Sequence, residues 1–179
     1  MQEASSFTGG GNDVGMVLIG GFFAARSREG EKALMQQVPQ TQLWLGNAAD
    51  LRDIPGLLNT GAEAIIDLAI EEPLPTLPRV INYCRFAITD DGEGAEAAIT
   101  AALQTGAAFI NANKILAVCC NAGINRSPTV AAAILALAKS ESFESQLRLV
   151  SSWKGIDVTP ALVARVETVL SQLNSTGSQ

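Results

Sequence analysis

The sequence contains no histidine among its 179 residues. Histidine is the commonest metal ligand and the side chain whose charge changes near neutral pH, so its absence excludes the usual metal sites and the usual acid–base catalyst. Any catalysis must use cysteine, carboxylate, arginine or hydroxyl groups. Positive charge is also scarce, because 12 Lys and Arg against 18 Asp and Glu give a formal net charge of −6. Nucleic acid and anionic membrane surfaces favour basic proteins, so we expect neither as a partner.

Cysteine is limited to Cys84, Cys119 and Cys120. This odd set has no CxxC spacing, so it predicts neither a disulfide framework nor a zinc site, and it favours a reducing, cytoplasmic location. Long hydrophobic runs are missing too. The apolar stretch at residues 14–25 spans twelve positions and follows Glu3 and Asp13 without a Lys or Arg. It is too short to cross a bilayer and lacks the basic start of a secretory signal. We expect no bound cofactor or metal.

The remaining composition suits a globular protein. Hydrophobic residues make up 47% of the chain and charged residues 17%, which favours a folded core over a disordered chain. The length fits one domain. The chain begins with a polar, glycine-rich stretch, so we predict a partly disordered N-terminal extension over residues 1–36 and a folded domain over residues 37–179.

Strand patterns alternate with helix patterns along the predicted domain. Short apolar segments that end at turn residues predict strands, and longer segments with helix-initiating prolines predict helices. The predicted strands are residues 41–46, 62–69, 80–88 and 114–120, and the predicted helices are residues 48–61, 94–113, 128–138, 143–153 and 160–173. This alternation predicts a single layered α/β domain with a largely parallel central sheet flanked by helices.

The stretch "VCCNAGINRSP" joins the most apolar predicted strand to a helix that starts near Pro128. A strand, a tight loop and a helix N-terminus in series form an anion-binding site, because loop N–H groups converge there and the helix dipole adds positive potential. Gly123 allows a positive φ in the loop, and the planar fork of Arg126 suits two oxygens of a phosphate. Positive potential at the base of the loop favours the thiolate form of Cys120. These residue types predict binding of, and attack on, a phosphate monoester.

The spacing of Cys120, five residues, Arg126 and Ser127 is the signature of the cysteine-dependent phosphatases, and the chain resembles a small dual-specificity protein phosphatase. The segments "LWLGNAADLRDIPGLLNTGAEAIIDLA", "FAITDDGEG" and "VTPALVARVETVL" extend the resemblance over residues 40–173. The resemblance implies a cysteine-phosphatase-like catalytic domain at residues 37–179. It also implies hydrolysis of phosphotyrosine, with phosphoserine and phosphothreonine as further candidates, through a phosphocysteine intermediate and without a metal.

The resemblance also implies a role for each site residue. Cys120 would attack phosphorus, and the Ser127 hydroxyl would stabilise its thiolate as leaving group while also serving as a helix cap. Asp90 would protonate the leaving oxygen, with Asp91 as the alternative. The phosphate oxygens would be bound by the loop amides and the guanidinium, that is, by Asn121, Ala122, Gly123, Ile124, Asn125 and Arg126.

One position departs from the family's pattern. The family normally has histidine immediately before the nucleophile, and this chain has Cys119. We interpret Cys119 as a small packing residue. The alternative is a redox role in which Cys119 or Cys84 resolves an oxidised Cys120.

The expected partner is a phosphorylated protein or a small phosphomonoester. The departure at Cys119 keeps a second function open, a phosphate-recognising module with weak or no turnover. An enzyme acting on lipid phosphates is a third candidate, but the protein is acidic and its loop has no lysine, which disfavours highly charged phosphoinositides.

Overall fold

The computed structural model describes residues 35–153 and 155–176. They contain a five-stranded sheet in the order β1-β2-β5-β3-β4. Its strands are β1 (Gln36–Gln37), β2 (Leu43–Asn47), β3 (Ala64–Asp67), β4 (Asn82–Arg85) and β5 (Leu116–Cys120). β1 pairs antiparallel with β2, and the other neighbouring strands are parallel. The predicted α/β domain with a largely parallel sheet is confirmed.

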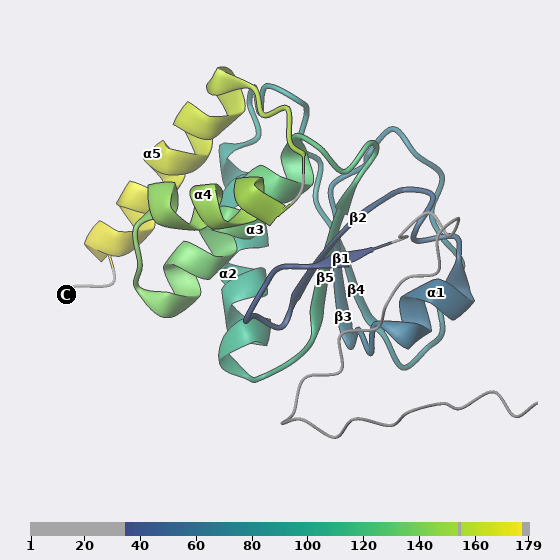
Figure 1. The fold of residues 1–179 in the computed structure, drawn as a ribbon. Helices are drawn as coiled ribbons and strands as arrows, with labels where there is room; N and C mark the ends of the chain where they lie inside the picture. The colour runs from purple at the N-terminus through teal and green to yellow at the C-terminus, as the bar shows by residue number, and fades with distance from the viewer. Residues whose placement is uncertain (1–34, 154, 177–179) are drawn as a thin grey trace, which may run out of the picture. The chain divides into compact units, whose positions relative to one another are not determined.

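Helices cover both faces of the sheet. They are α1 (Ile54–Asn59), α2 (Glu96–Asn111), α3 (Arg126–Lys139), α4 (Phe143–Trp153) and α5 (Pro160–Thr176). Figure 1 shows α2 to α5 gathered on one side of the sheet and α1 on the other. Each side has its own hydrophobic core, as expected for a parallel sheet buried on both faces.

β5 is the central strand, and its side chains alternate between the two cores. All five of its residues are buried. Leu116, Val118 and Cys120 belong to the core beneath α2 to α5, whereas Ala117 and Cys119 belong to the core on the side of α1. Successive side chains of a strand point to opposite faces. The two adjacent cysteines therefore face different cores.

α1 is shorter than the helix predicted over residues 48–61. Before it, the side chains of Asn47 and Asp50 accept hydrogen bonds from backbone N–H groups and form turns. Such side chain–backbone bonds compete with helix formation. The helix begins only after Asp53, whose carboxylate caps it, and Pro55 lies in its first turn.

The predicted N-terminal extension falls outside the described residues as far as residue 34. Met35 is buried against the sheet, and β1 begins at Gln36. Within residues 35–153 and 155–176, no helix has the length and apolar character needed to cross a membrane.

The strand order places the end of β5 in a crevice. β5 lies between β2 and β3, so Cys120 pairs with Asn47 and Cys119 pairs with Asp67 at the carboxyl ends of these parallel strands. β2 leads to α1 on one face of the sheet, and the adjacent β5 leads to α3 on the other face (Figure 1). Ligands of open α/β sheets bind where connections diverge in this way.

Candidate functional site

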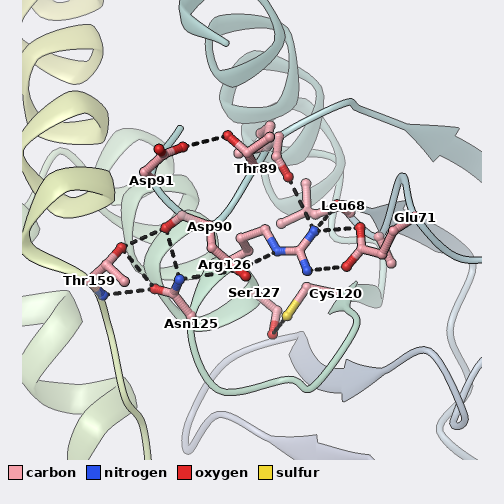
Figure 2. Close-up of polar contacts among 12 residues, drawn as sticks. Leu68, Glu71, Thr89, Asp90, Asp91, Cys120, Asn125, Arg126, Ser127 and Thr159 are labelled. Atoms are coloured by element: carbon pink, nitrogen blue, oxygen red, sulfur yellow. Dashed lines mark hydrogen bonds and ion pairs between the residues drawn. The ribbon is translucent and has the colours of Figure 1, made fainter. Parts of the chain in front are cut away.

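Cys120 lies at the base of the loop between β5 and α3. The residue is 2% exposed, and Figure 2 shows its side chain beside Ser127. The Cys120 Sγ is 3.3 Å from the Ser127 Oγ, and the Gly123 N–H donates to this sulfur at 3.2 Å. The thiol donates to the Ser127 Oγ, whose own hydrogen faces the Gly46 carbonyl at 3.5 Å. Once the thiol ionises, the hydroxyl can rotate to donate to the sulfur, and the hydroxyl and the Gly123 amide then stabilise the thiolate together.

The loop after Cys120 turns its carbonyls outward. The carbonyls of Asn121 and Ile124 accept hydrogen bonds from amides of the segments after β2 and before α5. All described peptide bonds are trans, so the N–H that follows each carbonyl points the opposite way. The amides of Ala122 and Asn125 are thereby directed inward, and Gly123 has the positive φ of 75° expected for it. This geometry is that of an anion cradle.

Arg126 is the buried cation of the site, with 4% of its surface exposed. Its Nη1 donates to the carbonyls of Leu68 at 2.9 Å and Ile88 at 3.2 Å. Nη1 and Nη2 also bind the two carboxylate oxygens of Glu71. Figure 2 shows the guanidinium held end-on by Glu71. The guanidinium is planar, so once Glu71 fixes its Nη1–Nη2 edge, the edge that carries Nε points in a defined direction.

A count of donors shows which edge of Arg126 is available. The guanidinium has five N–H groups. Two bind Glu71 and the second Nη1 hydrogen meets backbone carbonyls, which leaves Nε–H and one Nη2–H on the same edge. Nε lies 2.9 Å from the Asp90 Oδ1 as an ion pair, but without hydrogen-bond geometry. The two N–H groups of this edge can therefore donate to two oxygens of a phosphate in place of the Asp90 carboxylate.

Glu71 and Arg126 fix each other's charge. The hydrogen bonds from the guanidinium lower the pKa of the Glu71 carboxyl to about 2. The same pairing raises the pKa of Arg126, with further contributions from the charges of Cys120 and Asp90. Both groups are ionised across the physiological range.

The two candidate acids occupy different positions. Asp90 lines the same pocket as Cys120 and contacts Arg126, and its side chain is 67% exposed. Asp91 accepts hydrogen bonds from the Glu93 N–H and the Thr89 hydroxyl within its own loop, which lower its pKa. Asp91 lines a neighbouring hollow outside the pocket that contains the thiol. The structure thus brings Asp90, and not Asp91, next to the cradle.

The pocket above Cys120 has a volume of about 340 Å³. Most of the predicted phosphate-binding residues surround it, together with two residues of the segment before α5. The lining residues are Asp90, Cys120, Asn121, Ala122, Ile124, Asn125, Arg126, Asp157 and Thr159. Gly123 and Ser127 contact the sulfur directly. In the described part of the chain, no group of three or more Cys, Asp or Glu side chains could hold a metal ion.

Glu71 and Thr159 are site residues that the sequence did not reveal. Glu71 follows β3 and reaches Arg126 across 55 positions of the chain. Thr159 precedes α5, and its N–H and hydroxyl contact Asn125 and Asp90. Both contacts depend on the tertiary fold, and no local motif distinguishes Glu71 from Glu72.

The arrangement of the cysteines does not support a resolving pair. Cys119 faces the core opposite to that of Cys120. Cys84 lies on β4, separated from β5 by β3, and two strand spacings amount to about 9–10 Å. A disulfide needs Cβ atoms about 3.5–4.5 Å apart. The packing role of Cys119 fits this geometry, since Cys119 is fully buried.

Comparison with known proteins identifies the fold. No family model and no curated protein matches the sequence. Solved structures do match: a mouse putative dual specificity phosphatase in complex with zinc tungstate has a TM-score of 0.74 at 18% identity and covers 86% of this chain and 97% of its own. Human DUSP28 has a TM-score of 0.69 at 20% identity, with coverage of 80% and 97%. The human tyrosine phosphatase-like serine/threonine/tyrosine-interacting protein has a TM-score of 0.66 at 17% identity, with coverage of 83% and 100%.

These likenesses show that the chain has the fold of the dual-specificity cysteine phosphatases. They cover nearly the whole length of the matched structures, so the similarity extends beyond the loop around Cys120 to the sheet and its helices.

Proposed function

We propose that the protein is a phosphatase that hydrolyses phosphotyrosine, and phosphoserine or phosphothreonine in addition, through a phosphocysteine intermediate. The observation that carries this proposal is the pairing of Cys120 with the available edge of Arg126 in one pocket. A nucleophile at the base of an anion cradle is the arrangement that phosphoryl transfer to sulfur requires.

In the first step, the Cys120 thiolate attacks phosphorus and a sulfur–phosphorus bond forms. The bond from phosphorus to the leaving oxygen breaks, and Asp90 gives its proton to that oxygen. The loop amides and the two available N–H groups of Arg126 stabilise the equatorial oxygens. The proposal gives Asp90 this role because Asp90 lines the same pocket as Cys120.

In the second step, water attacks the phosphocysteine. Asp90, now a carboxylate, takes a proton from the water, and the phosphorus–sulfur bond breaks. The departing thiolate of Cys120 is stabilised by the Ser127 hydroxyl 3.3 Å away. Inorganic phosphate is released, and no step requires a metal.

The rival function is phosphate recognition with weak turnover, and one similar structure is named phosphatase-like. Retention of Cys120, Arg126 and Asp90 around one pocket favours turnover. Lipids with several phosphates fit less well, because Arg126 is the only cation among the residues lining this pocket and carboxylates lie at its mouth.

A steady-state assay with an aryl phosphate tests the proposal, with wild type compared with Cys120→Ser and Cys119→Ser. Cys120→Ser should lower turnover by about three orders of magnitude or more while still binding tungstate, because the cradle remains and the nucleophile is lost. Cys119→Ser is the matched control, since its side chain is an adjacent buried thiol that faces the other core.

Wild-type protein that binds tungstate but hydrolyses no aryl phosphate or phosphotyrosine peptide would support the recognition module instead. If Cys120→Ser were active and Cys119→Ser inactive, the assignment of Cys120 as the nucleophile would be wrong.

A further inference from the structure

The geometry points to the Asn125 side chain as a positioning residue that holds the Asp90 loop over the cradle. This inference rests on the proposed function, because it assigns Asp90 the role of acid. The Asn125 Nδ2 donates to the Asp90 carbonyl at 2.9 Å and to the Asp90 Oδ1 at 3.3 Å. Its Oδ1 accepts the Thr159 N–H at 2.9 Å. One buried amide thus joins three segments, the acid loop, the cradle and the start of α5, as Figure 2 shows.

The chemistry of the partners fixes the orientation of this amide. A backbone carbonyl can only accept a hydrogen bond, and a backbone N–H can only donate one. The Asn125 Nδ2 must therefore face Asp90 and its Oδ1 must face Thr159. The Thr159 hydroxyl closes the triangle by donating to the same Asp90 carbonyl at 2.6 Å.

Asn125 is itself held by the helix that follows. Its backbone carbonyl accepts hydrogen bonds from the Thr129 N–H at 3.2 Å and the Thr129 hydroxyl at 2.8 Å, within the first turn of α3. These bonds involve only the main chain of Asn125. A substitution that shortens the side chain therefore removes the bridge to Asp90 but retains the anchor of the cradle.

The bridge matters most when phosphate is bound. The Asp90 carboxylate also contacts the Arg126 Nε, at 2.9 Å. Phosphate oxygens need that edge of the guanidinium, so the Asp90 side chain must leave it and take up a proton before it can protonate the leaving oxygen. The bonds from Asn125 and Thr159 to the Asp90 carbonyl do not involve the carboxylate. They keep the backbone of Asp90 in place while its side chain moves.

The test compares two aryl phosphates that differ in their need for an acid. Phenyl phosphate has a poor leaving group, whereas 4-nitrophenyl phosphate has a good one. A general acid contributes about 10²–10⁴-fold for a poor leaving group. We expect Asn125→Ala to lower kcat for phenyl phosphate by about 10–100-fold, with a much smaller loss for 4-nitrophenyl phosphate.

Three further variants separate positioning from a general structural role. Asp90→Asn should show the same leaving-group pattern with a larger loss, and the double variant Asn125→Ala/Asp90→Asn should be no worse than Asp90→Asn, because the two changes remove one function. Thr159→Val should lower kcat for phenyl phosphate by a smaller factor than Asn125→Ala does, again with little change for 4-nitrophenyl phosphate. Thr159→Ser keeps the hydroxyl, so its kcat for phenyl phosphate should be close to that of the wild type. The inhibition constant of tungstate should stay within about twofold in Asn125→Ala, since the phosphate contacts remain.

Equal losses on both substrates, additive effects in the double variant, or a large change in tungstate inhibition would overturn the positioning role of Asn125. A wild-type enzyme inactive on both aryl phosphates would overturn the proposed function itself, so the two failures are distinguishable.

Discussion

Glu71 determines how Arg126 presents itself to a ligand. Its two oxygens bind the end of the guanidinium, and its pKa is held at about 2 by that contact. The side chain of Arg126 is 5% exposed and that of Glu71 is 40% exposed. The buried guanidinium of Arg126 is thus held in position by a carboxylate that is partly exposed to water.

Replacing Glu71 by Gln should weaken phosphate binding and turnover. The amide nitrogen of Gln would face an N–H of Arg126, so one of the two hydrogen bonds between the side chains would be lost. A hydrogen bond to a charged group contributes about 1.5–3 kcal/mol. We expect kcat/KM for an aryl phosphate to fall by about 10–100-fold. Glu72→Gln is the control, because Glu72 pairs with Arg52 on the surface. Similar kinetics for both variants would contradict the role of Glu71.

The pair of Glu71 and Arg126 should make the stability of the fold depend on pH in the acidic range. The folded-state pKa of Glu71 is lowered, so its stabilisation is fully present above the unfolded pKa of about 4.3 and is lost as the pH falls toward about 2. The difference in Tm between wild type and Glu71→Gln should therefore shrink between pH 5 and pH 2. Partial exposure of the carboxylate will keep the effect modest. A difference that grows on acidification would contradict the lowered pKa.

At the scale of elements, α2 and α3 approach closely at Gly106. A Cβ placed on Gly106 would lie 2.4 Å from the Ile134 Cδ1 and 2.7 Å from its Cγ1. Glycine inside a helix costs about 1 kcal/mol relative to alanine. The close packing of the two helices explains why glycine is present in spite of that cost.

Gly106→Ala should destabilise the fold. The gain in helix propensity is about 1 kcal/mol, but overpacking costs typically about 1–3 kcal/mol. Ile134 is fully buried, and its χ1 is restricted in a helix, so it cannot rotate away. We expect a net loss of about 1 kcal/mol and a fall in Tm of roughly 2–4 °C. Ile134→Val in the same chain should recover part of the loss in a double-mutant cycle, and a more stable Gly106→Ala would show that the helices can separate freely.

The elements that the sequence predicted well are those with strong local patterns. The continuous apolar run before Cys120 and the proline near the start of α3 identified the strand, the loop and the helix, and hence the cradle. α1 was predicted too long because the turns formed by Asn47 and Asp50 resemble a helix start. Glu71 and the side-chain bridge of Asn125 were missed, since their contacts join segments far apart in the sequence.

At the scale of the whole molecule, negative charge gathers around the proposed phosphate site. Asp91 and Glu93 line the hollow beside the pocket, and Asp157 lines the pocket itself. We call these three carboxylates the acidic rim. Arg126 is the only cation among the residues that line the two hollows. The rim should repel anionic groups next to the phosphate and attract cationic ones.

This charge distribution predicts a preference among phosphopeptides. A phosphotyrosine peptide flanked by lysines should have a kcat/KM about tenfold higher than one flanked by glutamates, since electrostatic steering raises association rates by about 10–10³-fold. The preference should shrink as ionic strength rises from 0.01 M to 0.15 M, because the Debye length falls from about 30 Å to about 8 Å. Both effects are measured as kcat/KM against salt for the two peptides.

Variants of the acidic rim separate this local effect from the net charge of −6. The double variant Glu93→Gln/Asp157→Asn removes two carboxylates of the rim and should narrow the preference for the lysine-flanked peptide severalfold. Glu167→Gln is the matched control, because Glu167 is exposed on α5 and lines neither hollow. If Glu167→Gln narrows the preference for the lysine-flanked peptide as much per charge removed as the double variant does, the selectivity follows the net charge of the protein. If the glutamate-flanked peptide is the better substrate, the acidic rim does not determine the choice of substrate.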